Sequence, residues 1–338
     1  MSDSPGRNEA IGIIGQMDFS EFLRQQHGIT VARLPDGRHH VKVQPEQGCG
    51  GAAMSWTTTY PPELILEIHA TKRAFVCDEI RREEDPRYVE RAIRHEVLGY
   101  VDAEAFRGKR ILDFGCGAGA STLVMSRLFP PCEIVGVELE QRLLHLARLR
   151  ADHLGRSTLK FFLSPSGTAL PAGLGEFDYI VLSAVYEHLL PGERRSLLPR
   201  IWSHLKPGGV LFINQTPHRY SPIEMHTTGL PLINYLPDAL AHTATKRFCK
   251  RIKGDEDWPA LLRAGIRGAT IGEILRMLGG AATLLEPKQG DAIDLWHGKL
   301  SQRYALVKKA IWAALKALKP IAGMHLVPEL TLAIRKLA

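Results

Sequence analysis

The fold is decided by the stretch Arg110-Ile111-Leu112-Asp113-Phe114-Gly115-Cys116-Gly117-Ala118-Gly119-Ala120-Ser121-Thr122. An apolar run that ends in an acid and three alternating glycines, followed by helix formers, predicts a buried strand that turns sharply into a helix. The first glycine allows a backbone conformation that residues with a Cβ avoid, the second lets the main chain approach a ligand, and the third lets the helix pack closely. The stretch therefore predicts a site for a nucleotide-like ligand.

The glycine pattern alone leaves two cofactor classes open. It also fits a dinucleotide-binding fingerprint, in which Glu138, at the end of the apolar run 133–138, would hold a ribose. Asp113 favours a different ligand, because a carboxylate there attracts a cation and would repel a pyrophosphate. A nicotinamide-dependent oxidoreductase stays open as an alternative, but it leaves Asp113 without a role.

Four segments, taken in order, resemble the motifs of the class I S-adenosylmethionine-dependent methyltransferases. They are the glycine stretch with Asp113, Glu138 at the second motif, Phe177-Asp178-Tyr179-Ile180-Val181-Leu182-Ser183 at the fourth, and Leu205-Lys206-Pro207-Gly208-Gly209-Val210-Leu211 at the fifth. They follow one another at the expected spacings over about 100 residues, and together they are far more specific than any one alone. The resemblance implies an enzyme with a Rossmann-like fold that uses S-adenosyl-L-methionine (SAM) as its methyl donor.

The resemblance also implies which residues bind the cofactor. They are Asp113, Gly115, Cys116, Gly117, Gly119, Glu138, Leu139, Ser166 and Ser183. Ser166 stands where the family often has an acid near the adenine, so this chain departs from the family pattern there. We therefore expect adenine recognition to depend on backbone groups or on Ser166.

The order of the predicted elements gives the fold class. From residue 109 onward strands and helices alternate, which predicts an α/β fold with a doubly wound, mostly parallel sheet. A helix at 270–278 and a strand at 282–286 are expected to close the sheet late in the chain. We expect three parts: an N-terminal extension at 1–104, with a hairpin around Asp36-Gly37 and helices over the cleft, a methyltransferase-like domain at 105–300, and a basic helical tail at 301–338.

Residues 216–268 form a predicted insertion after the fifth strand. It leaves the carboxyl end of that strand, which is where ligands bind in open parallel sheets. His226, His188 and Glu224, in that order, are the candidate catalytic bases for an acceptor hydroxyl. The alternative for this segment is a rigid proline-rich loop whose polar groups serve its own backbone. His218 and His226 lack the spacing of a usual zinc site, so we predict no metal.

Charge and composition limit the partners. The net charge is +7, and residues 298–338 hold eight Lys and Arg against Glu329 as their one acid. A nucleic-acid enzyme would spread its basic residues around a cleft, so nucleic acid is disfavoured. Residues 304–319 form a basic amphipathic helix, which either packs on the domain by its apolar side or lies on an anionic membrane.

The remaining composition points to an intracellular setting. Five cysteines show no paired metal or redox spacing, and no signal-peptide core or apolar run of ~18 residues is present. We expect a cytoplasmic protein, with peripheral contact at the inner face of the membrane left open. The expected function is methyl transfer to a small-molecule or glycan/lipid-linked acceptor, by O- or N-methylation. A cofactor-binding adaptor protein without catalysis is the alternative outside the enzymes.

Overall fold

The computed structural model describes residues 21–26, 28–44, 53–252, 254–299, 305–322 and 327–337. Contacts divide the chain into two units, Met1–Glu84 and Asp85–Ala338. The boundary that we expected at residue 104 lies instead at residue 84, because Ile93, Val97 and Tyr100 belong to the core of the second unit. The helical segment around these residues is therefore part of the larger unit.

The first unit combines an antiparallel sheet with helices. Its strands are β1 (Glu21–Gln26), β2 (Ile29–Arg33), β3 (His39–Val43) and β4 (Ser55–Thr58), paired in that order. The helical segments that follow are α2 (Pro62–Lys72), η2 (Arg73–Phe75) and α3 (Val76–Glu84). The hairpin predicted around Asp36-Gly37 is confirmed by the antiparallel pairing of β2 with β3.

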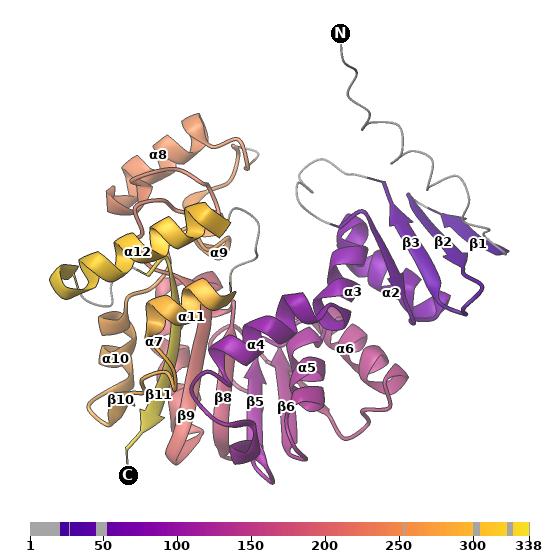
Figure 1. Cartoon of the computed structure of the whole chain (residues 1–338), viewed down its shortest axis with the longest axis horizontal. Helices are drawn as coiled ribbons and strands as arrows, with labels where there is room; N and C mark the ends of the chain where they lie inside the picture. The colour runs from indigo at the N-terminus through magenta and orange to yellow at the C-terminus, as the bar shows by residue number, and fades with distance from the viewer. Residues whose placement is uncertain are drawn as a thin grey trace. The chain divides into compact units, whose positions relative to one another are not determined.

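The second unit is built on one seven-stranded sheet. Its strands are β5 (Arg110–Phe114), β6 (Glu133–Glu138), β7 (Lys160–Leu163), β8 (Phe177–Ser183), β9 (Leu205–Pro217), β10 (Ala282–Leu284) and β11 (Glu329–Lys336). The strand order is β10-β11-β9-β8-β5-β6-β7 (Figure 1). Strands β5 to β9 are parallel, and β11 runs antiparallel to both of its neighbours. The predicted doubly wound, mostly parallel sheet is confirmed.

Strand β11 corrects the expectation of a purely helical tail. Leu330, Leu332 and Ile334 are buried in one core cluster, and Ala333 is buried in another, so both faces of the strand are covered. In the sheet, β11 lies between β9 and β10, so the strand predicted at 282–286 pairs with β11 and not with β9. Strand β9 contains the whole fifth motif, including the Lys-Pro-Gly-Gly segment, and continues beyond it to Pro217.

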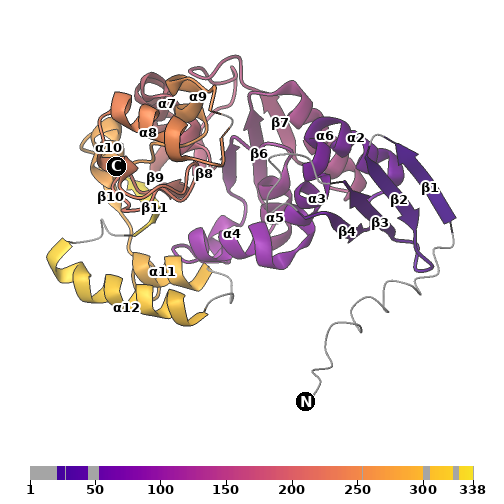
Figure 2. The ribbon, with the colours of Figure 1, turned by 90° about the horizontal axis from the view of Figure 1, so that it is seen from above.

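Some helical segments of the second unit cover the two faces of the sheet, and others belong to the insertion or lie near the C-terminus. They are η3 (Pro86–Glu90), α4 (Arg91–Glu96), η4 (Ala103–Phe106), α5 (Ala120–Leu128), α6 (Gln141–His153), η5 (Tyr186–His188), α7 (Pro191–Ser203), η6 (Ile233–Tyr235), α8 (Asp238–Phe248), α9 (Trp258–Arg263), α10 (Ile271–Leu278), α11 (Ala292–Lys299) and α12 (Ala305–Ala322). Apolar residues of α4, α5 and α11 pack on one face, and those of α7 and α10 pack on the other. Figure 2 shows α4 and α11 on the opposite side of the strands from α7.

Helix α12 docks through ion pairs and through Trp312 and Leu315, which pack against a buried cluster of Ile293, Trp296 and Val327. Lys316 Nζ lies 3.0 Å from an Asp291 oxygen and 2.7 Å from an Asp294 oxygen, and Lys319 Nζ lies 2.6 Å from Asp291. Trp312 Nε1 donates to Asp294 Oδ1 at 2.9 Å. Lys316 and Lys319 are therefore paired with the acids at the start of α11, while their side chains stay 32% and 40% exposed.

The apolar face of α12 is consequently turned away from these acids. Leu306 is 84% exposed and Val307 is 59% exposed, while Ile311, Leu315 and Leu318 line a cavity. Among the described residues, no helix has the length and apolar character to cross a membrane. The helix thus presents apolar side chains to a cavity and to solvent.

Candidate active site

The glycine loop joins β5 to α5 at the carboxyl edge of the sheet. Gly117 and Gly119 have φ angles of +56° and +85°. A Cβ on Gly119 would lie 2.9 Å from Cβ of Ala147, so this glycine permits close packing by α6. A Cβ on Gly117 would meet no atom within 4 Å among the described residues, so this residue faces open space. The loop therefore has one packed side and one open side.

Asp113 lies beneath this loop rather than on its open side. Its side chain is 1% exposed, and Oδ2 accepts hydrogen bonds from Ser121 Oγ at 2.7 Å and Thr122 Oγ1 at 2.6 Å. Burial raises the pKa of Asp113 to about 6, and the nearby Glu138 adds to this increase. A positive charge near the loop would favour the ionised form of Asp113.

Glu138 connects the end of β6 to the glycine loop. Its Oε2 accepts a hydrogen bond from the main-chain N–H of Gly117 at 2.9 Å. Its Oε1 accepts from the N–H groups of Leu139 at 2.7 Å and Glu140 at 3.1 Å. The two motifs that are separate in the sequence thus share one carboxylate in the structure.

The other predicted cofactor residues lie around the same edge. Cys116 is buried with Leu144 and Phe161, so only its backbone can meet a ligand on the loop. Leu139 is 49% exposed, and Ser166 follows β7, where its hydroxyl bonds with Thr168. Ser183 ends β8, opposite Asn214 of β9.

A cavity of about 670 Å³ opens beyond the carboxyl ends of β8 and β9. Ala184 and Gln215 line it, and both have left-handed backbones, with φ of +55° and +60°. Such conformations are strained for residues with a Cβ and gather at functional sites. The structure thus places a cavity at the edge of the sheet where the sequence predicted acceptor binding.

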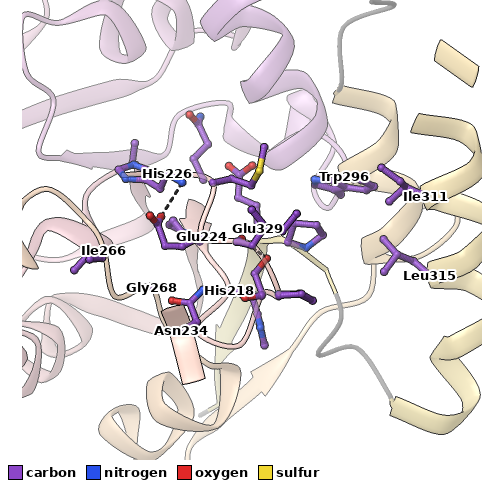
Figure 3. Close-up of a pocket in the computed structure, with 18 of the residues that line it drawn as sticks. His218, Glu224, His226, Asn234, Ile266, Gly268, Trp296, Ile311, Leu315 and Glu329 are labelled. Atoms are coloured by element: carbon purple, nitrogen blue, oxygen red, sulfur yellow. Dashed lines mark hydrogen bonds between the residues drawn. The ribbon is translucent and has the colours of Figure 1, made fainter. Parts of the chain in front are cut away.

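The cavity has a polar part and an apolar part (Figure 3). Segment 215–234 supplies most of the polar side chains, including His218, Glu224, His226 and Asn234. Helices α11 and α12 supply only apolar side chains to the wall, Trp296, Ile311, Leu315 and Leu318, while Ile223, Met225 and Ile266 add further apolar surface on the other side. A ligand with both polar and apolar parts matches this division.

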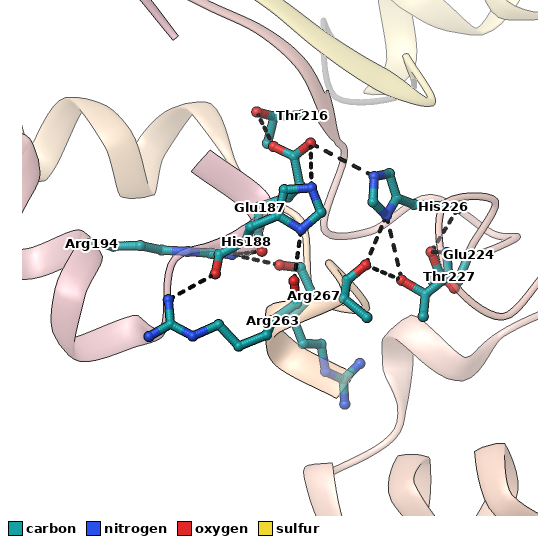
Figure 4. Close-up of polar contacts among 10 residues, drawn as sticks. Glu187, His188, Arg194, Thr216, Glu224, His226, Thr227, Arg263 and Arg267 are labelled. Atoms are coloured by element: carbon teal, nitrogen blue, oxygen red, sulfur yellow. Dashed lines mark hydrogen bonds and ion pairs between the residues drawn. The ribbon is translucent and has the colours of Figure 1, made fainter. Parts of the chain in front are cut away.

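Two of the predicted catalytic residues, His226 and His188, meet beside the polar part, where His226 lines the cavity and His188 lies behind it. The rings of His188 and His226 have centroids 5.3 Å apart, although 37 residues separate them in the chain. The Nε2 atoms of both rings lie 3.7 Å from Oε1 of Glu187 (Figure 4). Glu187 is fully buried, and Thr216 Oγ1 donates to its other oxygen at 3.2 Å.

Glu224, the third predicted base, has a different environment. Its carboxylate accepts hydrogen bonds from the N–H groups of His226, Thr227 and Thr228 at 2.8, 2.9 and 2.5 Å, and from the Thr228 hydroxyl at 2.7 Å. These bonds hold the loop that carries His226. The geometry therefore suits Glu224 to positioning that loop.

The comparisons with known proteins identify the family. A model described as a methyltransferase domain matches residues 111–209, which include the glycine loop, Glu138 and the fourth and fifth motifs. The chain belongs to the class I S-adenosylmethionine-dependent methyltransferases. This methyltransferase therefore uses SAM, and the nicotinamide alternative and the adaptor without catalysis are set aside.

Relatives of the methyltransferase act on different acceptors. It is 29% identical over 231 residues to a trans-aconitate 2-methyltransferase of Methylobacterium radiotolerans, covering 67% of this chain and 74% of that protein. A trans-aconitate 2-methyltransferase of Variovorax paradoxus is 28% identical, with 56% and 60% covered. A demethylmenaquinone methyltransferase of Lactococcus lactis is 26% identical, with 58% and 75% covered. Their different acceptors leave the acceptor of this enzyme to be inferred from its own cavity.

Solved structures were also compared with the chain. PKMT2 from Rickettsia typhi has a TM-score of 0.46 and 16% identity, covering 74% of this chain and 52% of that one.

Sequence reasoning missed Glu187 and the contribution of α12 to the cavity. Glu187 immediately precedes His188 at the end of the fourth strand, and this adjacency was the available signal. No comparable signal connects α12 to the cavity, because the contact depends on the docking of Lys316 and Lys319 on Asp291.

Proposed function

We propose that this methyltransferase methylates an oxygen or nitrogen atom of a small amphiphilic acceptor. The polar end of the acceptor would lie at His226, and its apolar part would lie along Trp296, Ile311 and Leu315. The observation that carries this proposal is that the part of the wall from α11 and α12 is entirely apolar, whereas nearly all polar side chains of the cavity come from segment 215–234.

The residues of the glycine loop fit the donor. When bound, SAM supplies a methyl group on a positively charged sulfur that is a good leaving group. Glu138 would accept hydrogen bonds from the ribose hydroxyls, and Gly117 leaves space for the ligand. The charge of Asp113 below the loop would favour a cationic ligand. Gly115, Cys116 and Gly119 would contribute backbone, and Leu139, Ser166 and Ser183 would flank the adenosine.

The charge of the cavity wall argues against a polycarboxylate acceptor. Among the described residues, the wall contains the carboxylates of Glu224 and Glu329 and no lysine or arginine. A substrate such as trans-aconitate, the acceptor named for two of the relatives, would lose its hydration there without gaining a cationic partner. A phenol or quinol with an apolar tail, the type of acceptor named for the Lactococcus lactis relative, would place its tail against α12.

The imidazoles are the groups that would act on the acceptor. His226 belongs to the cavity wall, and its Nδ1 donates to the Ala264 carbonyl at 3.1 Å, so its Nε2 keeps a lone pair. We assign His226 and His188 to activation of the acceptor's hydroxyl or amine, and we assign Glu224 to positioning. The remaining task is to hold the acceptor atom in line with the methyl carbon and to exclude water.

Methyl transfer from radiolabelled SAM would test this function. The acceptor panel contains a phenol with a prenyl tail, the same phenol without the tail, trans-aconitate and RNA. We expect the tailed phenol to be labelled with the lowest KM. Labelling of trans-aconitate or RNA in its place would contradict the proposal.

A pair of variants makes this test specific to the apolar wall. Leu315→Asp should raise KM for the tailed phenol at least about tenfold, because burying one such side chain against an apolar group is worth ~1.5–3 kcal/mol. The matched control is Leu306→Asp, since Leu306 lies on the same helix but is 84% exposed. Equal effects of the two substitutions would exclude α12 as the tail-binding wall.

A further inference from the structure

Three hydrogen-bond acceptors converge at the polar end of the cavity. They are Oε1 of Glu187 and the Nε2 atoms of His188 and His226, and all three lie within 4.8 Å of one another. Each imidazole nitrogen is 3.7 Å from the carboxylate oxygen, which is too long for a direct hydrogen bond. Oε1 of Glu187 is buried and has no hydrogen-bond partner in the part of the chain that the structure describes.

Main-chain carbonyls determine which nitrogen of each ring has the lone pair. His188 Nδ1 lies 2.7 Å from the carbonyl oxygen of Arg263, and His226 Nδ1 lies 3.1 Å from that of Ala264. A carbonyl oxygen only accepts, so both Nδ1 atoms carry hydrogen. Both Nε2 lone pairs are therefore directed toward Glu187. An imidazole that donates its other N–H to a carbonyl is the usual arrangement of a metal-ligating histidine.

The two carbonyls belong to consecutive residues at the end of α9. This helix is fixed at its start by Asp257, whose Oδ1 accepts from the N–H of Ala260 at 2.8 Å. The next residue, Gly265, has a φ of +92°, and a Cβ there would lie 2.6 Å from Nδ1 of His226. Only glycine fits both the backbone and this close approach, so the local fold is built around the position of His226.

Nearby arginines do not occupy the gap between the three acceptors. Arg194 donates to the carbonyls of Leu189, Gly268, Glu187 and Arg267 at 2.9, 2.9, 3.2 and 2.7 Å. Its guanidinium is thus used by the main chain around the cluster. A buried carboxylate oxygen that faces two imidazole lone pairs needs a proton or a metal ion among the three acceptors, and no arginine supplies the positive charge there in the part of the chain that the structure describes.

We propose that Glu187, His188 and His226 bind a divalent transition-metal ion of the Zn²⁺ type. Two imidazole nitrogens and one carboxylate oxygen form a known ligand set for a zinc site that keeps an open coordination position. Ligands of a tetrahedral zinc ion are ~3.4 Å apart, so the two separations of 3.7 Å need to close by a few tenths of an ångström. The two imidazole nitrogens lie within 4.8 Å of each other, so a small rotation of the rings would complete the site. This site was not predicted from the sequence, where only the His218–His226 spacing was considered.

The position of the ion suggests its use. His226 belongs both to the cluster and to the cavity wall, so an open coordination position there would meet the polar end of the acceptor. With the ion bound, both Nε2 lone pairs would be metal ligands, so the two imidazoles would activate the acceptor through the ion and not as free bases. This role rests on the proposed function, whereas the existence of the metal site does not.

Metal binding to the full-length protein would test the site without any acceptor. Metal-stripped protein is titrated with Zn²⁺ in competition with a zinc-binding dye, and separately with Co²⁺ while its visible d–d absorption is recorded. We expect about one equivalent per chain, with Co²⁺ bands of a site that has nitrogen and oxygen ligands. The substitutions His188→Gln and His226→Gln should each weaken Zn²⁺ binding at least ~100-fold. The side chain of His188 is 41% exposed in the wild type.

His204→Gln is the matched control. His204 Nδ1 also bonds a main-chain carbonyl, that of Gly175 at 2.6 Å, but it does not belong to the Glu187 cluster. Its substitution should leave Zn²⁺ affinity unchanged. A wild-type protein that binds neither ion, or cluster variants that bind as tightly as the control, would overturn the proposal.

The outcome separates the metal site from the proposed function. A protein that labels the tailed phenol but binds no Zn²⁺ or Co²⁺ overturns the site and leaves the function intact. A protein that binds one ion through His188 and His226 but labels only trans-aconitate supports the site and contradicts the proposed acceptor.

Discussion

Replacing Glu138 should weaken SAM binding by an amount that its hydrogen bonds define. A carboxylate offers about four lone-pair sites, and three N–H groups occupy sites on Glu138. One site, on Oε2, remains for a ribose hydroxyl. A hydrogen bond to a charged group contributes about 1.5–3 kcal/mol. We therefore expect Glu138→Ala to raise the Kd for SAM by roughly 10- to 150-fold.

Titration calorimetry of the wild type and the variant with SAM would measure this change. The control is Glu140→Ala, because Glu140 is an exposed carboxylate two residues further along that receives no hydrogen bond from the loop through its side chain. Thermal unfolding of each variant would show whether the fold is retained.

The ribose contact has to be separated from the support that Glu138 gives to Gly117. An S-adenosylhomocysteine analogue that lacks the ribose hydroxyls should lose affinity for the wild type and much less for Glu138→Ala. The reasoning is refuted if the folded variant binds SAM within twofold of the wild type, or if removing the hydroxyls costs the variant as much as the wild type.

Two further predictions concern the same loop. Gly119→Ala should lower the free energy of unfolding by about 2–5 kcal/mol, because the new Cβ meets Ala147. Gly117→Ala should lower it by only ~1–2 kcal/mol but abolish SAM binding, because the new Cβ enters the open side of the loop. Equal decreases in the free energy of unfolding, measured in urea, would contradict this. Burial raises the pKa of Asp113 from 3.8 to about 6. Between these two pH values the folded chain keeps a proton on Asp113 that the unfolded chain has lost, so the free energy of unfolding falls as the pH rises from 3.8 to about 6. Asp113→Asn removes this loss. The free energy of unfolding of the variant minus that of the wild type should therefore increase by up to roughly 3 kcal/mol between about pH 4 and pH 7. A difference that stays constant with pH would disprove the buried charge.

The glycine loop and its neighbours could be predicted because their structure is local. The apolar run before Asp113 specifies a buried strand, and the glycines allow a turn that follows directly from their lack of a Cβ. Glu138 could be predicted for a similar reason, since it ends the next apolar run. The helix predicted at 270–278 is also local, since Thr270 caps it by accepting from the N–H of Glu273 at 3.1 Å.

The C-terminal segment could not be predicted in the same way. Residues 329–336 give a weak local signal, and they form a strand because β9 and β10 leave a place between them. The amphipathic pattern of α12 predicted the helix, but not which side would dock. Asp291 and Asp294 decided that by binding Lys316 and Lys319.

The sequence by itself determined the methyltransferase family, the parallel sheet and the loop expected to hold the donor, because each depends on residues that are neighbours in the chain. Only the tertiary structure decided the acceptor side. It brought Glu187 and His188, at the end of the fourth strand, beside His226 of the insertion and placed Leu315 across the cavity. These contacts join distant segments, so their geometry follows from packing and ion pairing rather than from any local pattern.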